Sequence, residues 1–181
     1  MNTQQWGDRI DALVANTPHL STGCVLAECA STQDHARALG IGALVVAQRQ
    51  SGGRGQRGNV WADTGQDGLA FSVCLPATTN PQRSADIAAA IVDALADLFP
   101  GRITVKHPND VLLDDRKLAG VLIEQADGQA VIGIGINVAQ TNWPPPLDET
   151  AISLAQAGIK LDRLDLLERV LPEVLRAWQA A

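Results

Sequence analysis

The sequence contains no tyrosine, and aromatic residues make up only 3% of its 181 positions. A buried core must therefore come mainly from Ala, Val, Leu and Ile. Hydrophobic residues account for 46% of the chain and charged residues for 19%, an ordinary balance for a globular protein. A chain of this length commonly forms one domain around a single core. We therefore expect one globular domain with an aliphatic interior.

Features of membrane and secreted proteins are also missing. No run approaches the ~18 consecutive apolar residues of a membrane span, and residues 1–11 are polar and mixed in charge, unlike a secretion signal. The three cysteines, Cys24, Cys29 and Cys74, lack the spacing of a metal site or a redox pair. An odd number of cysteines without a secretion signal indicates reduced thiols. These absences predict a cytoplasmic protein without a membrane partner.

Basic residues are too few for a general nucleic-acid surface. The chain has 14 Lys and Arg against 20 Asp and Glu, which gives a net charge of -6. Binding to nucleic acid requires a basic face that neutralises phosphates. The helix expected at the start of the chain, residues 4–15, is too short to include a helix-turn-helix module. We therefore expect no nucleic-acid partner.

The apolar pattern predicts strands that follow one another closely, with few helices between them. Strands are expected at residues 23–28, 43–49, 69–75, 103–106, 111–113, 118–124 and 129–138. Helices are expected at residues 4–15, 31–40, 84–99 and 161–180, with a proline-rich loop at 141–150. This order is not the steady alternation of a βαβ protein. It predicts an α+β fold with a mixed, mostly antiparallel sheet and helices on one side.

The most distinctive stretch, residues 50–61, places four glycines and two arginines between two expected strands. Glycine allows the backbone to approach a ligand closely. Exposed backbone N–H groups together with arginine suit an anion such as a phosphate. A flexible surface connection is the alternative, and this stretch alone does not decide between them.

A second polar cluster lies between Lys106 and Lys117. Lysine acts as a point charge toward phosphate or carboxylate. Asn109 and Asp110 offer oxygens, and Mg²⁺ prefers a few protein oxygens together with substrate phosphates. Taken singly, these residues also fit a turn or the flank of a hairpin. Together with the arginines of the glycine-rich stretch, they predict a site for a nucleoside triphosphate and a carboxylate.

These motifs resemble those of biotin protein ligases in order and spacing. The matching stretches are Glu28 to Thr32, Gly53 to Trp61, Lys106 to Asp110, Lys117 to Glu124 and Gly133 to Val138. The resemblance runs from about Glu28 to the final helix. Five ordered motifs make it far more specific than one glycine-rich loop.

The resemblance implies the biotin/lipoate ligase catalytic-domain fold, which is related to class II aminoacyl-tRNA synthetase cores. It implies a biotin–[acetyl-CoA-carboxylase] ligase that uses ATP and Mg²⁺. Biotin would be activated to biotinoyl-5'-AMP with release of pyrophosphate. A specific lysine of a biotin carboxyl carrier domain would then attack the mixed anhydride. A homodimer is also compatible, because family members dimerise through sheet edges.

The resemblance assigns roles by motif position. The residues expected to bind biotin are Ser31, Thr32, Gln50, Gly53, Arg54, Lys117, Gly120 and Gly135. Those expected to bind the nucleotide are Arg54, Arg57, Gly58, Trp61, Lys106, Asn109, Lys117 and Asn137. Lys117 and Arg54 are expected to be catalytic, and Asp110 to serve Mg²⁺. For Ser31 and Thr32, capping of the following helix is the alternative.

The chain departs from the family pattern in ways that leave two alternatives open. Gln56 stands where arginine is usual, and His107 where tryptophan is usual. We expect residues 1–181 to form a single catalytic domain, without an N-terminal DNA-binding module or the C-terminal β-barrel of many bacterial members. One alternative is a lipoate or octanoate ligase or transferase on the same scaffold. The other is a non-catalytic protein that binds biotin or biotinoyl-AMP.

Overall fold

The computed structural model describes residues 3–62 and 65–180 and consists of two compact units. The first unit comprises Met1–Thr79 and Leu122–Gly135, and the second comprises Asn80–Val121 and Ile136–Ala181. A seven-stranded sheet has the order β1-β2-β5-β9-β8-β7-β6, and β3 pairs separately with β4. Within residues 3–62 and 65–180, no helix is both long and apolar enough to cross a membrane.

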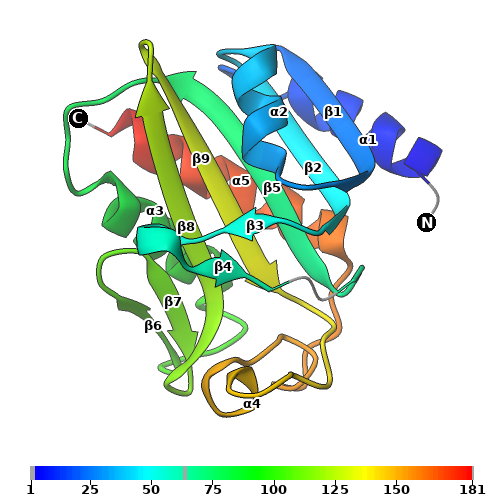
Figure 1. The fold of residues 1–181 in the computed structure, drawn as a ribbon, viewed down its shortest axis with the longest axis vertical. Coiled ribbons are helices and arrows are strands. Elements are labelled where there is room, and N and C mark those ends of the chain that lie inside the picture. The colour runs from blue at the N-terminus through cyan, green and yellow to red at the C-terminus, as the bar shows by residue number, and fades with distance from the viewer. Residues whose placement is uncertain (1–2, 63–64, 181) are drawn as a thin grey trace. The chain divides into compact units, whose positions relative to one another are not determined.

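In the first unit, a parallel pair of strands is connected through a helix. β1 (Thr22–Cys29) runs parallel to β2 (Ala43–Gln50), and α2 (Thr32–Leu39) joins them. A parallel pair needs such a crossover, because a tight turn can join only antiparallel strands. β2 in turn pairs antiparallel with β5 (Gly68–Pro76), so the predicted mixed sheet is confirmed (Figure 1).

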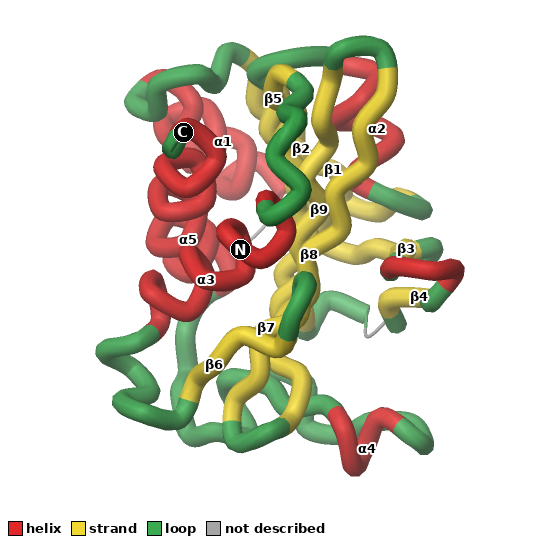
Figure 2. The backbone as a smooth tube through the Cα atoms, turned by 90° about the vertical axis from the view of Figure 1, so that its left-hand side faces the viewer, coloured by secondary structure: helices red, strands yellow, loops and turns green. Residues whose placement is uncertain are grey.

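Helices cover both faces of these three strands. α1 (Thr3–Ala15) packs on β1, whereas α2 packs on β2 and β5. Figure 2 shows α1 and α2 on opposite sides of the strands. The prediction of helices on one side is therefore wrong for this unit. The crossover helix must pack back onto one face, which leaves the other face to be buried by α1.

A small aliphatic cluster lies beneath α2. Ala36 of α2 packs with Val45 of β2 and Cys74 of β5, and all three are fully buried. The three cysteines of the chain are free in the structure, as their number predicts. Burial raises the pKa of the Cys29 and Cys74 thiols. Aliphatic residues and thiols thus fill the space that aromatic residues occupy in many cores.

The glycine-rich stretch is more ordered than the predicted loop. It forms a hairpin in which β3 (Gly53–Arg54) pairs with β4 (Val60–Trp61), with a short 3₁₀ turn, η1 (Gln56–Gly58), between them. Arg57 and Gly58 have φ values of 58° and 82°, and these left-handed residues reverse the chain. Residues 53–61 are referred to below as the hairpin. Figure 2 shows it on the same side of the first unit's strands as α2.

The second unit packs helices against an antiparallel sheet. α3 (Arg83–Leu95) packs on α5 (Arg163–Gln179), and also on β6 (Ile103–Lys106) and β7 (Asp110–Leu113). Apolar residues at helical spacing on α3, including Ile87 and Ile91, are fully buried there. The proline-rich segment, predicted to be a loop, contains the short helix α4 (Leu147–Thr150).

β8 (Arg116–Ala126) and β9 (Gln129–Asn137) contribute residues to both units. β7 pairs antiparallel with β8 through a turn at Asp114 and Asp115, whose φ values are 49° and 63°. The two consecutive left-handed residues are typical of a tight hairpin turn. The hairpin predicted at this point of the sequence is confirmed.

Phe71 on β5 is fully buried, and we predict that Phe71→Ala lowers the free energy of unfolding by about 3–5 kcal/mol. The loss combines the transfer of the ring to water with the cavity that it leaves. Denaturant-induced unfolding measures the change. Ile41→Ala is the control, since that residue is 52% exposed. An equal effect of the two substitutions would contradict the described core.

Candidate active site

The parallel register brings the ends of β1 and β2 together. Cys29 lies opposite Gln50, so the residues that follow β1 begin α2 next to the end of β2. Ser31 caps α2, because its Oγ accepts a hydrogen bond from the Gln33 N–H at 3.3 Å. Gln50 Oε1 accepts two hydrogen bonds from Thr32, one from the backbone N–H at 2.9 Å and one from the hydroxyl at 3.1 Å.

A third polar side chain completes this cluster. Thr32 Oγ1 lies 2.8 Å from Ser72 Oγ, and both residues are buried. Because the Thr32 hydroxyl donates to Gln50, Ser72 donates to Thr32. Thr32, Gln50 and Ser72 are named the polar cluster. Ser72 was not expected from the sequence, and its signal there is a single hydroxyl in the apolar run 69–75.

Glycines allow the hairpin to pack closely against the polar cluster and β9. A Cβ on Gly53 would lie 2.8 Å from Gln50 Nε2, and one on Gly135 would lie 2.5 Å from Cε2 of Trp61. Both distances are shorter than real Cβ contacts allow. The structure thus places the predicted residues Gln50, Gly53, Trp61 and Gly135 next to one another.

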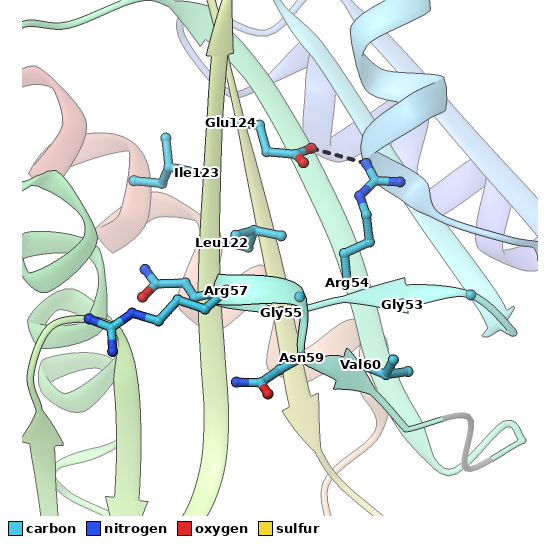
Figure 3. Close-up of a pocket in the computed structure, with 12 residues that line it drawn as sticks. Gly53, Arg54, Gly55, Arg57, Asn59, Val60, Leu122, Ile123 and Glu124 are labelled. Atoms are coloured by element: carbon cyan, nitrogen blue, oxygen red, sulfur yellow. Dashed lines mark hydrogen bonds and ion pairs between the residues drawn. The ribbon is translucent and has the colours of Figure 1, made fainter.

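An open cavity of about 730 Å³ lies along the hairpin. Its lining consists of residues 52–60 together with Leu122, Ile123 and Glu124 of β8. Figure 3 shows Arg54 directed toward Glu124, whereas Arg57 extends away from Arg54. Two cations and one carboxylate therefore border this cavity, which is consistent with a site for a charged ligand.

Arg54 is held by two carboxylates. Its guanidinium donates to both oxygens of Asp34 at 2.8 and 3.0 Å, and to Glu124 Oε2 at 3.0 Å. The hydrogen bonds from Arg54 hold the pKa of Asp34 below its usual range and raise the pKa of Arg54. By contrast, Arg57 is exposed and has no ion pair among residues 3–62 and 65–180. Arg54 is therefore already bound by carboxylates, whereas the charge of Arg57 is accessible to a ligand.

Several backbone N–H groups of the glycine-rich stretch bind within the chain. Ser51 and Gly52 donate to the carbonyls of Cys29 and Ala30, and Gly55 donates to the Asn59 carbonyl at 2.7 Å. The expectation that a run of free N–H groups faces an anion is wrong at these positions. These N–H groups instead complete the end of the sheet and the hairpin by bonding to backbone carbonyls.

In the second unit, Lys117 and Asp110 form an ion pair. Lys117 Nζ lies 2.7 Å from Asp110 Oδ1, and the side chain of Asp110 is only 22% exposed. The ladder between β7 and β8 places Asp110 opposite Gly120. Lys106 lies opposite Asp110 across the ladder between β6 and β7. The predicted residues Lys106, Asp110, Lys117 and Gly120 thus lie on three adjacent strands.

Two predicted asparagines in this unit use their side-chain amides to bind the backbone. Asn137 Nδ2 donates to the carbonyls of Lys117 and Ile152 at 3.0 and 3.1 Å. Asn109 Nδ2 donates to the Val121 carbonyl at 2.8 Å. Both donors of the Asn137 amide are therefore occupied, so this residue holds the backbone of the lysine that carries the expected chemistry.

The carboxylates of the second unit fit only one kind of magnesium site. The described residues contain no group of three or more His, Cys, Asp or Glu side chains that could hold a metal ion. Mg²⁺ is commonly bound through one or two carboxylates and the phosphates of the substrate. The donors therefore fit an ion that arrives with a nucleotide and uses Asp110, rather than a metal held by protein ligands alone.

We predict that Gly135→Ala displaces the Trp61 ring, because the new methyl group would overlap it. The free energy of unfolding should fall by about 1–3 kcal/mol, and acrylamide should quench tryptophan fluorescence more strongly. Adding Trp61→Phe should abolish the additional quenching. Gly7→Ala is the control, since nothing lies within 4 Å of its added Cβ. Unchanged quenching in Gly135→Ala would contradict the packing of Trp61 on β9.

The family model for the biotin/lipoate A/B protein ligase family matches residues 27–140. The chain belongs to this family. The matched range includes both the polar cluster and the pair of Lys117 with Asp110. Membership therefore covers the candidate site in each unit.

Individual relatives are similar at 30–37% identity. A bifunctional ligase/repressor BirA from Bacillus subtilis is 37% identical over 142 residues, which cover 72% of this chain and 44% of that protein. A biotin–[acetyl-CoA-carboxylase] ligase from Paracoccus denitrificans is 34% identical over 179 residues, 86% of this chain and 72% of that protein. The chain thus spans less than half the length of the Bacillus relative.

The fold is confirmed by solved structures. A biotin protein ligase from Aquifex aeolicus, in complex with biotin and ATP, matches with a TM-score of 0.79 and 30% identity. The match covers 87% of this chain and 70% of that one. The predicted biotin/lipoate ligase catalytic-domain fold is therefore correct.

Proposed function

We propose that this chain activates biotin with ATP to biotinoyl-5'-AMP and transfers the biotinoyl group to a lysine of a biotin carboxyl carrier domain. The main support for this proposal is the structural similarity to a biotin protein ligase from Aquifex aeolicus in complex with biotin and ATP. The Paracoccus relative, named a biotin–[acetyl-CoA-carboxylase] ligase, supports the same activity. We further propose a cytoplasmic enzyme without a nucleic-acid partner, and a homodimer remains compatible with the family.

The polar cluster would bind the head group of biotin. The ureido ring of biotin carries one carbonyl acceptor and two N–H donors, so it requires a site with hydrogen-bonding groups on a fixed frame. Thr32, Gln50 and Ser72 provide hydroxyl and amide groups that are already hydrogen-bonded to one another. Such preorganised groups select a ligand with matching donors and acceptors, because a mismatch leaves buried polar groups unpaired.

The first chemical step joins two anions. A biotin carboxylate oxygen attacks the α-phosphorus of ATP, and the bond to the bridging oxygen breaks as pyrophosphate leaves. Lys117 would stabilise the negative charge on the carboxylate and the α-phosphate. Arg57, the hairpin arginine without an ion pair among the described residues, would contact phosphate oxygens. A Mg²⁺ ion held by Asp110 and the ATP phosphates would neutralise further charge on the phosphates.

The second step transfers the acyl group. The neutral amine of the acceptor lysine attacks the acyl carbon of biotinoyl-AMP, AMP leaves, and the nitrogen loses a proton. The new amide bond keeps biotin attached to the carrier. Gly58, Trp61, Lys106, Asn109 and Asn137 would bind the nucleotide in both steps, as their motif positions imply.

We predict that Lys117→Ala reduces biotin-dependent release of pyrophosphate by about 10²-fold or more, since a cation aimed at developing charge is lost. The assay contains biotin and Mg-ATP and is repeated without biotin. Lys160→Ala, at an exposed position of the second unit, is the control and should leave the rate unchanged. Full activity in Lys117→Ala, or turnover without biotin, would refute the proposed reaction.

The same assay separates the remaining alternatives. A lipoate or octanoate ligase would release pyrophosphate with those acids and not with biotin. A non-catalytic binder would bind biotin tightly in calorimetry and release no pyrophosphate. The proposed ligase requires biotin for turnover and should bind lipoate far more weakly.

Gln56 stands at the turn of the hairpin, where family members usually carry arginine. Without that positive charge, the adenylate is held less firmly. We predict that Gln56→Arg slows the escape of biotinoyl-AMP about 10-fold, because a charged hydrogen bond is worth roughly 1.5–3 kcal/mol. Trapping of free biotinoyl-AMP after rapid dilution measures the escape rate. Equal escape from the wild type and Gln56→Arg would show that this position does not retain the adenylate.

A further inference from the structure

We infer that Asp34 and Glu124 are positioning residues that hold the hairpin in place through Arg54. The three side chains come from separate elements of the first unit. Asp34 lies in the first turn of α2, Arg54 on β3 and Glu124 on β8. Arg54 thus connects the hairpin to two elements that belong to the packed body of the unit.

The hairpin needs such an anchor because its own ladder is very short. Only two residue pairs join its strands, Gly53 with Trp61 and Arg54 with Val60. A hairpin of this size is unstable in water without further contacts, and Val60 is 78% exposed. Trp61 is anchored against Gly135 of β9. On the β3 side, the described interactions of the Arg54 side chain are those with Asp34 and Glu124.

The geometry of the network suits an anchor. Arg54 binds Asp34 through two parallel hydrogen bonds, which fix the orientation of the guanidinium plane. The same nitrogen, Nη2, donates to Asp34 Oδ1 and to Glu124 Oε2. Figure 3 shows its contact with Glu124. Arg37 adds a further link, since its Nη2 donates to the Glu124 carbonyl at 3.3 Å. Two arginines and two carboxylates therefore balance in charge.

This network also limits what Arg54 can do for a ligand. A phosphate or carboxylate that approaches Arg54 must compete with two carboxylates at 2.8 to 3.0 Å. Arg57 faces no such competition among the described residues. Arg54 would therefore serve the site by fixing the hairpin, and Arg57 by contacting the anion. The effect on biotin binding rests on the proposed function, whereas the anchoring of the hairpin does not.

Amide hydrogen exchange of the ligand-free protein at pH 7 tests the anchor. The reporter is the Gly55 N–H, which donates to the Asn59 carbonyl within the hairpin. In the double variant Asp34→Asn with Glu124→Gln, the network loses both negative charges at nearly constant shape. We expect the Gly55 amide to exchange about 5-fold faster or more, as two partly exposed ion pairs are lost. The single variant Asp34→Glu keeps a carboxylate at this position and leaves Glu124 intact. Its Gly55 amide should therefore exchange at nearly the wild-type rate.

A matched control is available in the second unit. Arg102 binds both oxygens of Asp114 at 3.0 and 2.6 Å, so Asp114→Asn removes a similar two-bond pair that includes no residue of the hairpin. It should leave Gly55 exchange unchanged. Exchange of the Val45 amide in β2 checks that the first unit remains folded. Wild-type exchange of Gly55 in the folded double variant would overturn the inference.

The catalytic consequence has a separate readout. The double variant should raise KM for biotin several-fold with a smaller change in kcat, since the hairpin is less often in place. Asp114→Asn should change neither constant. An unchanged KM alongside faster Gly55 exchange would overturn the positioning role in binding. Absence of biotin-dependent turnover in the wild type would instead refute the proposed function and leave the exchange result standing.

Discussion

The parallel pairing of β1 with β2 is the constraint on which the first unit depends. Parallel strands end at the same edge of a sheet, and the connection between them must cross over the sheet. α2 makes that crossover, so its first turn begins beside the end of β2. The register that pairs Cys29 with Gln50 then lets Thr32 bond to Gln50. The parallel direction of β1 and β2 thus brings together Thr32 and Gln50 of the polar cluster, which are 18 positions apart in the sequence.

Two cations assigned to chemistry by the family motifs are already paired with carboxylates. Arg54 binds Asp34 and Glu124, and Lys117 binds Asp110. The chain has 20 Asp and Glu against 14 Lys and Arg, so carboxylates are more numerous than the cations that they can pair with. Pairing keeps long cationic side chains oriented before a ligand arrives, and it also sets what an incoming anion must displace. Arg57, exposed at the turn of the hairpin, offers the complementary property of an accessible charge.

The sequence predicted the features that depend on neighbouring residues. The strands, the cap at Ser31 and the turn at Asp114 and Asp115 follow from local periodicity and turn chemistry. The short hairpin at residues 53–61 was expected only as a loop, because its two-residue strands are too brief for a periodic signal. Its stability comes from contacts with β9, α2 and β8 that sequence spacing does not reveal.

For the candidate site, the sequence motifs named the expected residues but not the side chains that bind them in the structure. Ser72 joins the polar cluster only because β5 lies beside β2. Asp34 and Glu124 meet at Arg54 although they are 90 positions apart in the chain (124 − 34). Such pairings depend on tertiary structure. The placement of α2 opposite α1 was missed for the same reason, since strand direction was not apparent from the apolar pattern.

The most direct test of the proposed activity is biotin transfer to a biotin carboxyl carrier domain from the same cell. The protein, biotin, Mg-ATP and the carrier domain are incubated together, and the carrier is analysed by mass spectrometry. We expect one biotinoyl group on a single carrier lysine, formed only when both biotin and ATP are present. An unmodified carrier, or a carrier modified by lipoate or octanoate instead of biotin, would contradict the proposed activity.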